Sequence, residues 1–342
     1  MDTASFDFDL PDHLIAQEAV EPRDQSRLMV VRRATKTWEH RVFADLPDLL
    51  EPGDVLVRNN TRVVPARIVG QRAATGGRWE GLYLRTLTDG AWEILAKTRG
   101  NPAIGERVVV GQGLSLALEA KLGEGRWRVQ PDSDQAAESL LQIHGSIPLP
   151  PYIRKGVESL GDRARYQTVY AEVPGSVAAP TAGLHFTPEV FDRLDARGIA
   201  RVDLTLHVGI GTFRPIEAER IDDHVLHAER AELTREAAET LNRKRAEGAK
   251  IVAVGTTSAR TLETASRSGR FEPFSGETAL YLKPGHAFQG VDALVTNFHL
   301  PRSSLLVLVS ALAGVDLIHA AYQEAIRRQY RFYSYGDSML IL

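Results

Sequence analysis

A single histidine, His185, lies within a long run of small residues that ends at a predicted helix start. The run extends from Gly175 to Pro188, where Thr187 suits the N-cap and Pro188 the first helical position. Small side chains let backbone N–H groups approach a ligand, and the helix adds the positive end of its dipole. The run therefore predicts either a binding loop with a proton-transfer group or a tight connection in which His185 is only hydrogen-bonded.

A second histidine, His207, lies near the end of a predicted strand at residues 201–208, along which apolar residues alternate. An open α/β sheet usually presents its ligand crevice at such a strand end. The residues that follow are Gly209, Gly211, Thr212 and Phe213. The glycine pair favours nicotinamide binding only weakly, because no third glycine opens a helix and no acidic residue follows in the dinucleotide pattern.

Two more histidines, His224 and His227, are three residues apart, and Glu229 follows closely. The two imidazoles would share one face if this segment were helical, with the carboxylate close behind. The zincin spacing is absent, so we expect no metal here. A neutral imidazole pair that assists binding or acid–base chemistry and a pair of surface histidines remain the alternatives.

Hydroxyl side chains follow a short apolar run at 251–254 that suits a buried strand. Thr256, Thr257 and Ser258 precede a predicted helix at 259–265, so hydroxyls and backbone N–H groups would converge on a carboxylate or phosphate. The lysine of a P-loop is missing, and Arg260 could clamp a carboxylate in a bidentate manner. An N-cap cluster without a ligand is the structural alternative.

Two later segments place polar groups beside aromatic rings. Asn297, Phe298 and His299 end a predicted strand at 293–298, and Tyr335 and Asp337 lie near the C-terminus. Aromatic faces beside polar edges suit a nucleobase or a sulfonium cation, although each segment alone could be ordinary packing.

The composition is that of a globular protein. Of its residues, 43% are hydrophobic and 25% are charged. The length of 342 residues favours two domains. The absence of cysteine excludes disulfides, thiolate catalysis and the common structural zinc sites. A formal charge of -3 argues against broad, non-specific binding to nucleic acid but not against a local basic patch. We find no signal peptide or membrane anchor and expect a cytoplasmic protein.

The pattern of short segments indicates how the domains are arranged. Six short alternating segments between residues 66 and 130, separated by turn signals, predict a small β-barrel. Helices alternate with strands from residue 188 onward, which predicts an α/β domain with a mainly parallel or mixed sheet. Residues 1–62 and 152–342 would form this large discontinuous domain, and residues 63–151 the inserted barrel.

Ten motifs are spread along nearly the whole chain: Asp9–Pro11, Leu14–Gln17, Arg23–Arg27, Asn59–Arg67, Gly175–Phe186, Leu206–Phe213, His224–Glu229, Val254–Ser258, Thr296–Pro301 and Tyr330–Asp337. Together they resemble the S-adenosylmethionine:tRNA ribosyltransferase-isomerase family of queuosine biosynthesis. One position departs from the family pattern, because Asn60 stands where an aspartate is expected.

The resemblance implies a reaction and its substrates. The ribosyl part of S-adenosylmethionine is transferred to 7-aminomethyl-7-deazaguanine at the wobble position of a tRNA and isomerised, which gives epoxyqueuosine and releases adenine and methionine. S-adenosylmethionine is then a substrate, and no cofactor is expected. The partners are the tRNA and S-adenosylmethionine, with no membrane, and the chain is a monomer or homodimer. A non-catalytic RNA-binding protein and an S-adenosylmethionine-dependent RNA methyltransferase are the rival hypotheses.

The implied chemistry needs a base, an acid for adenine and a pocket that tolerates a sulfonium. His185 and His207 are the first candidates for proton transfer, because imidazole titrates near neutrality. Glu229, His299 and Asp337 are the second candidates. Phe186, Phe213 and Phe298 could offer π faces, while Thr256–Ser258 and Arg260 could hold the methionine carboxylate. The remaining predicted binding residues are Thr181, Gly183, Gly209, Gly211, Thr212, Asn297 and Tyr335.

Overall fold

The structure is a computed structural model that describes residues 1–98, 100–111, 113–209 and 215–342. The chain forms two compact units. The first comprises Met1–Arg62, Pro150–Lys155 and Arg165–Leu342, and the second Val63–Leu149 and Gly156–Ala164. The sequence prediction put the inserted domain at 63–151, without the later segment.

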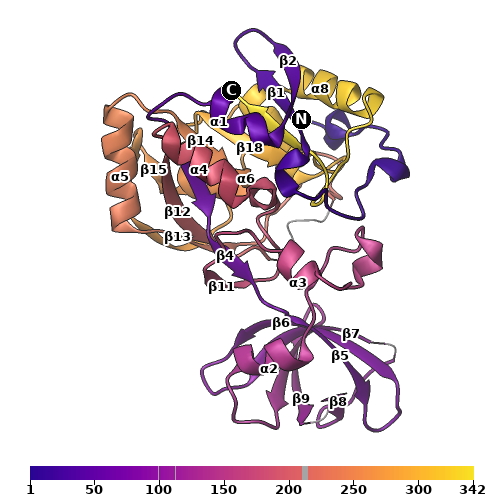
Figure 1. Ribbon diagram of the computed structural model, residues 1–342. Helices are drawn as coiled ribbons and strands as arrows, with labels where there is room; N and C mark the ends of the chain where they lie inside the picture. The colour runs from indigo at the N-terminus through magenta and orange to yellow at the C-terminus, as the bar shows by residue number, and fades with distance from the viewer. Residues whose placement is uncertain (99, 112, 210–214) are drawn as a thin grey trace. The chain divides into compact units, whose positions relative to one another are not determined.

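A nine-stranded mixed sheet forms the centre of the first unit, in the order β17-β13-β12-β3-β14-β18-β19-β1-β2 (Figure 1). β12, β3, β14 and β18 run parallel to one another, whereas β19 is antiparallel to β18 and parallel to β1. The predicted α/β class with a mixed sheet is thus confirmed. The strands are β1 Arg27–Arg32, β2 Thr37–Val42, β3 Val55–Asn59, β12 Ala200–Leu206, β13 Glu229–Leu233, β14 Ile251–Val254, β17 Phe274–Thr278, β18 Ala293–Asn297 and β19 Ser338–Ile341.

Helices cover both faces of this sheet, and the inner strand β14 is apolar throughout. Along β14, Ile251 and Ala253 join the core that lies under α5 to α8, whereas Val252 and Val254 join the core under α1 and α4. Burial on both faces explains the uninterrupted apolar run. The helices are α1 Leu46–Leu49, α4 Pro188–Ala196, α5 Arg235–Ala246, α6 Gly255–Ala265, α7 Ser304–Ala313 and α8 Val315–Arg327.

Helix starts follow the capping residues of the sequence. The side chains of Thr187, Thr234 and Ser303 each accept a hydrogen bond from the backbone N–H three residues later. α6 differs from the prediction, because it begins at Gly255 and includes Thr256–Ser258 in its first turn. Gly255 has φ of +86°, which lets the chain pass from β14 into the helix without a loop.

The second unit contains a closed antiparallel barrel in the order β10-β7-β6-β5-β8-β9, as predicted. Its interior is filled by Trp79, Trp92, Trp127 and aliphatic side chains, and Gly81 leaves room for the Trp79 ring. The strands are β5 Arg67–Arg72, β6 Arg78–Thr86, β7 Trp92–Thr98, β8 Arg107–Gly111, β9 Leu114–Gly123 and β10 Arg126–Pro131, with α2 at Ala137–His144. The other short strands and α-helix are β4 Thr61–Val63, α3 Asp162–Arg165, β11 Val173–Ser176, β15 Ser266–Arg267 and β16 Arg270–Phe271.

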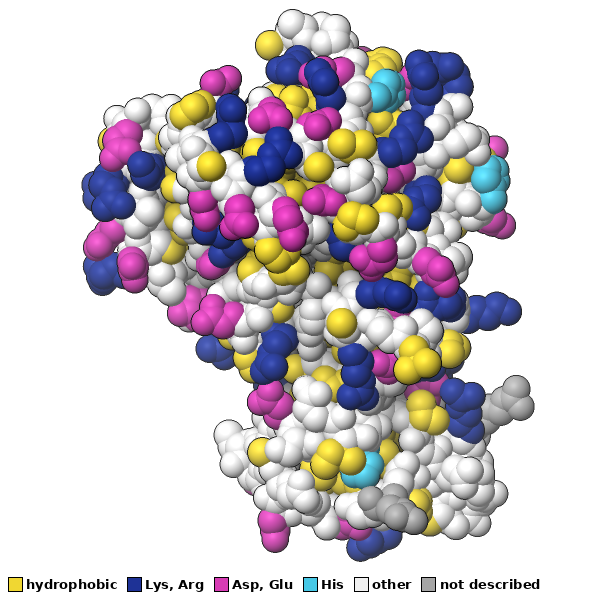
Figure 2. Space-filling model, in the orientation of Figure 1, with side chains coloured by type: hydrophobic (Ala, Val, Ile, Leu, Met, Phe, Trp, Pro, Cys, Tyr) yellow, Lys and Arg dark blue, Asp and Glu magenta, His cyan; other side chains and the backbone are white. Residues whose placement is uncertain are grey.

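Charges of both signs are interspersed on the face shown in Figure 2. Within the described residues no single helix is long and apolar enough to cross a membrane, and only α7 and α8, bent by 116° at their junction, pass that test as a pair. The same residues contain no group of three or more histidine, aspartate or glutamate side chains that could hold a metal ion.

Candidate active site

Predicted site residues from three segments meet beyond the carboxyl ends of β14 and β18. These strands are parallel neighbours, so the residues after them emerge at one edge of the sheet. The first turn of α6 follows β14, and His299 follows β18. A 3-10 turn at Thr181–His185, labelled η6, packs against both β18 and α6.

Two small cavities of about 30 Å³ each lie at this edge, and both are lined by Thr181, Asn297, His299 and Leu305. Tyr152, Phe298, Leu300, Ser303, Tyr333 and Ser334 complete the first cavity. Ala179, Pro180, Ala182, Val208, Gly255, Thr256, Thr257 and Thr296 complete the second.

Hydrogen bonds inside the protein occupy both ring nitrogens of His185. Nδ1 lies 2.7 Å from Ser26 Oγ, and Nε2 accepts from the Asn297 side-chain amide at 3.1 Å. The ring also stacks on Phe43. Burial, more than any nearby charge, lowers the pKa of His185 well below its usual range. The imidazole is therefore neutral and held in place by these contacts.

Asn297 holds η6 against the end of β18. Its amide N–H groups donate to His185 Nε2 and to the Tyr333 carbonyl at 3.1 Å each, and its Oδ1 accepts from the Thr181 hydroxyl at 3.0 Å. Gly183 brings the same turn close to Tyr170, because a Cβ at Gly183 would lie 2.0 Å from the tyrosine hydroxyl. Thr181 and Asn297 line the cavities, whereas the geometry gives Gly183 a packing role.

His299 lines both cavities and is 8% exposed. Its Nε2 lies 2.7 Å from Thr296 Oγ1, and its backbone N–H donates to the Tyr322 hydroxyl at 3.0 Å. Burial lowers the pKa of His299 to about 3. This ring is neutral at physiological pH.

His207 is half-buried at the end of β12, and its two ring nitrogens differ. Nδ1 lies 2.8 Å from Thr61 Oγ1. No hydrogen-bond partner lies near Nε2 within the described ranges. The ring packs against Gly175, where a Cβ would lie 2.9 to 3.1 Å from three ring atoms. Burial is the main cause that lowers the pKa of His207. Of the three predicted site histidines, His207 is more exposed than His185 and His299.

Glu229 and Arg260 form a buried ion pair, each with 5% of its surface exposed. Arg260 Nη1 donates to Glu229 Oε2, and its other nitrogens donate to the carbonyls of Leu280 and Thr278. Glu229 Oε1 accepts from the backbone N–H of Gly209 at 2.9 Å. These contacts use the guanidinium donors of Arg260 that were predicted to bind a substrate carboxylate.

The three hydroxyls in the first turn of α6 have different surroundings. Ser258 donates to the Val254 carbonyl at 2.7 Å, and Thr257 accepts from the Asn59 amide at 3.2 Å. Thr256 lines the second cavity, and its hydroxyl has no hydrogen-bond partner in the described part of the chain. Thr256 is therefore the hydroxyl of this turn best placed to meet a ligand.

Most of the predicted aromatic contacts lie in the hydrophobic core. Phe186 is stacked on Phe191 at 5.1 Å and meets Phe43 edge-on. Phe298 is fully buried among other rings but lines the first cavity. Tyr335 is 1% exposed, with the Arg23 guanidinium 5.5 Å above its ring. The predicted residues Gly211, Thr212 and Phe213 lie outside the described residues.

Asp337 links the backbone of two segments. Its carboxylate accepts hydrogen bonds from the N–H groups of Arg27 at 3.0 Å and Arg331 at 2.8 Å. Burial raises its pKa despite these two bonds. The contacts tie the C-terminal turn to β1, and the residue lines neither cavity.

The His224–Glu229 segment is not helical. The predicted shared face depended on a helix and is therefore not formed. Residues 224–228 are extended or irregular, and Glu229 begins β13. His224 packs edge-on against Tyr281, whereas His227 is exposed. Pairing of β13 with β12 and β17 prevails over any helical tendency here, so the histidines and Glu229 do not form one cluster.

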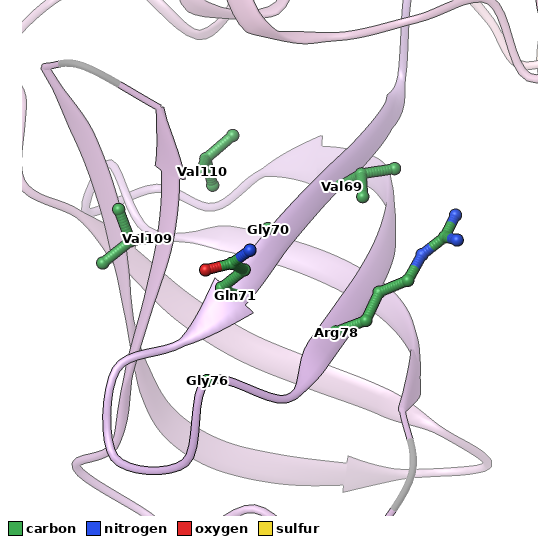
Figure 3. Close-up of a pocket in the computed structure, with 7 residues that line it drawn as sticks. All are labelled: Val69, Gly70, Gln71, Gly76, Arg78, Val109 and Val110. Carbon is green, nitrogen blue, oxygen red and sulfur yellow. The ribbon is translucent and has the colours of Figure 1, made fainter.

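The second unit contains a larger hollow, an open groove of about 530 Å³ on the barrel (Figure 3). It is lined by Val69, Gly70, Gln71, Gly76, Arg78, Val109 and Val110. None of the residues singled out from the sequence lines it. We therefore select the candidate site by the convergence of polar groups at the sheet edge and not by size alone.

The model of a family described as queuosine biosynthesis protein matches residues 3–341. The chain belongs to this family. S-adenosylmethionine:tRNA ribosyltransferase-isomerases from Symbiobacterium thermophilum and Desulfitobacterium hafniense are 53% and 49% identical to it over 100% of both chains. A crystal structure of S-adenosylmethionine tRNA ribosyltransferase from Thermotoga maritima is 38% identical, with a TM-score of 0.58 over 99% of this chain and 100% of that one.

Asn60, the departure from the expected pattern of the queuosine biosynthesis family, has two polar partners. Its Nδ2 donates to Glu172 Oε2 at 3.3 Å, and its Oδ1 accepts from the Thr205 hydroxyl at 2.7 Å. An aspartate would keep the contact with Thr205 but would face a second carboxylate. The neutral amide thus suits its neighbours in this family member.

Sequence reasoning assigned no role to three residues that hold the site histidines and strand ends. Ser26 contacts His185, and Thr61 contacts His207. Asn59 is fully buried and exchanges hydrogen bonds with both the N–H and the carbonyl of Leu206. All three lie in motifs quoted for the family resemblance, but their partners are 146 residues or more away in sequence.

Proposed function

We propose that this chain transfers and isomerises the ribosyl moiety of S-adenosylmethionine onto 7-aminomethyl-7-deazaguanine at the wobble position of tRNA. The products are epoxyqueuosine in the tRNA, adenine and methionine. The observation that carries the proposal is the full-length similarity to proteins with this enzyme name, at about half of all positions. We place the enzyme in the cytoplasm and treat S-adenosylmethionine as a consumed substrate, with no separate cofactor.

The sheet edge supplies groups that suit this reaction. The N-terminus of α6, with the Thr256 hydroxyl, provides donors and a positive dipole for the methionine carboxylate. His207 has a ring nitrogen without a partner among the described residues and is more exposed than His185 and His299, so we assign it to contact with the substrate. His185, bonded through both nitrogens, positions η6.

Product analysis tests the reaction. The protein is incubated with S-adenosylmethionine and an anticodon stem-loop that carries the aminomethyl base, and a matched RNA with guanine at that position is the control. We expect equal amounts of adenine and methionine and a heavier RNA with the modified substrate alone. S-adenosylhomocysteine would indicate a methyltransferase, and RNA binding without any product would indicate a binding protein. Either outcome refutes the proposal.

Two histidine variants test the assignment of roles. His207→Ala is expected to lower kcat about 100-fold, a usual cost of losing a proton-transfer or donor group, with the thermal midpoint close to that of the wild type. His185→Ala is expected to lower the thermal midpoint, because it leaves a cavity and unpaired Ser26 and Asn297 groups. Wild-type turnover in His207→Ala would remove this residue from the site.

A further inference from the structure

The contact between Thr61 and His207 determines where the imidazole proton lies. Thr61 is fully buried, and its hydroxyl oxygen is 2.8 Å from His207 Nδ1. Within the described part of the chain this nitrogen is the one hydrogen-bond partner of the hydroxyl. A buried hydroxyl whose proton has no acceptor is unfavourable, so the Thr61 hydroxyl donates and Nδ1 accepts.

A neutral imidazole carries one N–H group, and when Nδ1 accepts, the proton lies on Nε2. Nε2 has no partner among the described residues, so this N–H is available to a bound molecule. The groups that act on the ring keep it neutral. Burial and the positive charge of Arg230 lower the pKa of His207, and the smaller effect of Glu232 raises it.

Two further contacts hold the donor and the ring in place. Gly175 has φ of +144°, and a Cβ there would lie 2.9, 3.0 and 3.1 Å from Cε1, Nδ1 and Nε2 of His207. Near-equal distances to these three atoms mean that the ring lies with its face on the glycine. Asn59 accepts from the N–H groups of both Thr61 and Leu206, which fixes the strand ends that carry Thr61 and His207.

We propose that Thr61 is a positioning residue that fixes the Nε2–H tautomer of His207, so that His207 offers the substrate a hydrogen-bond donor and not a basic lone pair. Its partner is an acceptor atom on S-adenosylmethionine whose electron density rises as a bond breaks, such as a purine nitrogen or a ribose oxygen. A neutral imidazole donor can stabilise charge in this way without transferring its proton. The inference rests on the proposed function, in which His207 contacts the substrate.

Nitrogen NMR of the full-length protein with 15N-labelled histidine tests the tautomer directly, because a protonated and an unprotonated ring nitrogen have well-separated shifts. We expect Nε2 of His207 to be protonated in the wild type and in Thr61→Ser, which keeps the hydroxyl. In Thr61→Val, which keeps the shape but not the donor, the proton should be shared between the nitrogens or move to Nδ1.

Steady-state kinetics of the same three proteins test the consequence. Thr61→Val should lower kcat about 100-fold with little change in KM, as removal of a preorganised donor does, and Thr61→Ser should restore most of it. A proton on Nδ1 in the wild type, or wild-type kcat in Thr61→Val, would overturn the inference. The NMR measurement needs no turnover, so an inactive wild type would refute the proposed function and still leave the tautomer determined.

Discussion

Replacement of Glu229 by glutamine separates a structural carboxylate from a catalytic one. Glutamine has nearly the same size and can still accept from the Gly209 N–H, but it carries no charge to pair with Arg260. Because both side chains are about 95% buried, the guanidinium would remain in the interior without its counter-ion. Removing one partner of a buried ion pair costs about 3 to 5 kcal/mol of folding free energy.

Thermal unfolding followed by circular dichroism measures this cost. At about 2 to 4 °C per kcal/mol for a unit of this size, Glu229→Gln should lower the unfolding midpoint by about 6 to 20 °C. Arg260→Gln should have a similar effect. The double variant should be clearly more stable than the sum of the two losses predicts, because it leaves no unpaired charge.

Turnover measured well below the midpoint completes the experiment. A structural ion pair predicts that folded Glu229→Gln retains much of its activity, whereas a catalytic carboxylate predicts lost turnover at unchanged stability. A midpoint of Glu229→Gln within about 1 °C of the wild type would refute the argument, since a shift that small is far below the range expected for a broken buried pair. Additive losses in the double variant would refute it equally.

Three further substitutions test local parts of the structure. The pKa of His299 falls from its usual value to about 3 on folding, so His299 contributes stability above pH 6.5 that is lost toward pH 3, at up to about 1.4 kcal/mol per pH unit. In urea titrations, the free energy of unfolding should fall less between pH 7 and pH 4 for His299→Gln than for the wild type. An equal fall in the two proteins contradicts the low pKa. Asn60→Asp places a second carboxylate beside the exposed Glu172. The variant should therefore be less stable than the wild type by less than about 1 kcal/mol at pH 7, and by a smaller amount at pH 4. The opposite pH trend in thermal midpoints would show that the two groups do not interact. Gly183→Ala should lower the free energy of unfolding by about 1 to 3 kcal/mol, because the new Cβ meets the Tyr170 hydroxyl. Tyr170→Phe should relieve part of this loss in a double-mutant cycle. No relief would mean that the clash lies elsewhere.

The elements could be predicted from sequence because their signals are local. The strand at 251–254 has the observed bounds, since an apolar run followed by glycine specifies both the strand and its end. The helix starts after Thr187 and Thr234 depend on a side chain that bonds three residues along the same chain. Parallel strands present their carboxyl ends at one edge of a sheet, which predicts that Thr256, Asn297 and His299 lie close together. All three line the same cavity.

The hydrogen-bond partners within the site could not be predicted, because they come from distant segments. Ser26 and His185 are 159 residues apart, and nothing near His185 indicates that both its nitrogens are occupied. Arg260 lies where a substrate clamp was expected, yet Glu229 from a neighbouring element neutralises it. Nothing in the order of residues shows which of several polar groups at a strand end bond one another and which are left for a ligand.

The position of β19 has a consequence for synthesis of the chain. This strand, formed by residues 338–341, lies between β18 and β1, so it joins two halves of the large sheet. β1 at residues 27–32 therefore has no partner on that side until more than 300 further residues have left the ribosome. β1 and β2 can form a hairpin meanwhile, but its inner edge stays unpaired and open to association with other chains. Chaperone dependence of expression, and aggregation of chains truncated before Ser338, should follow from this late closure.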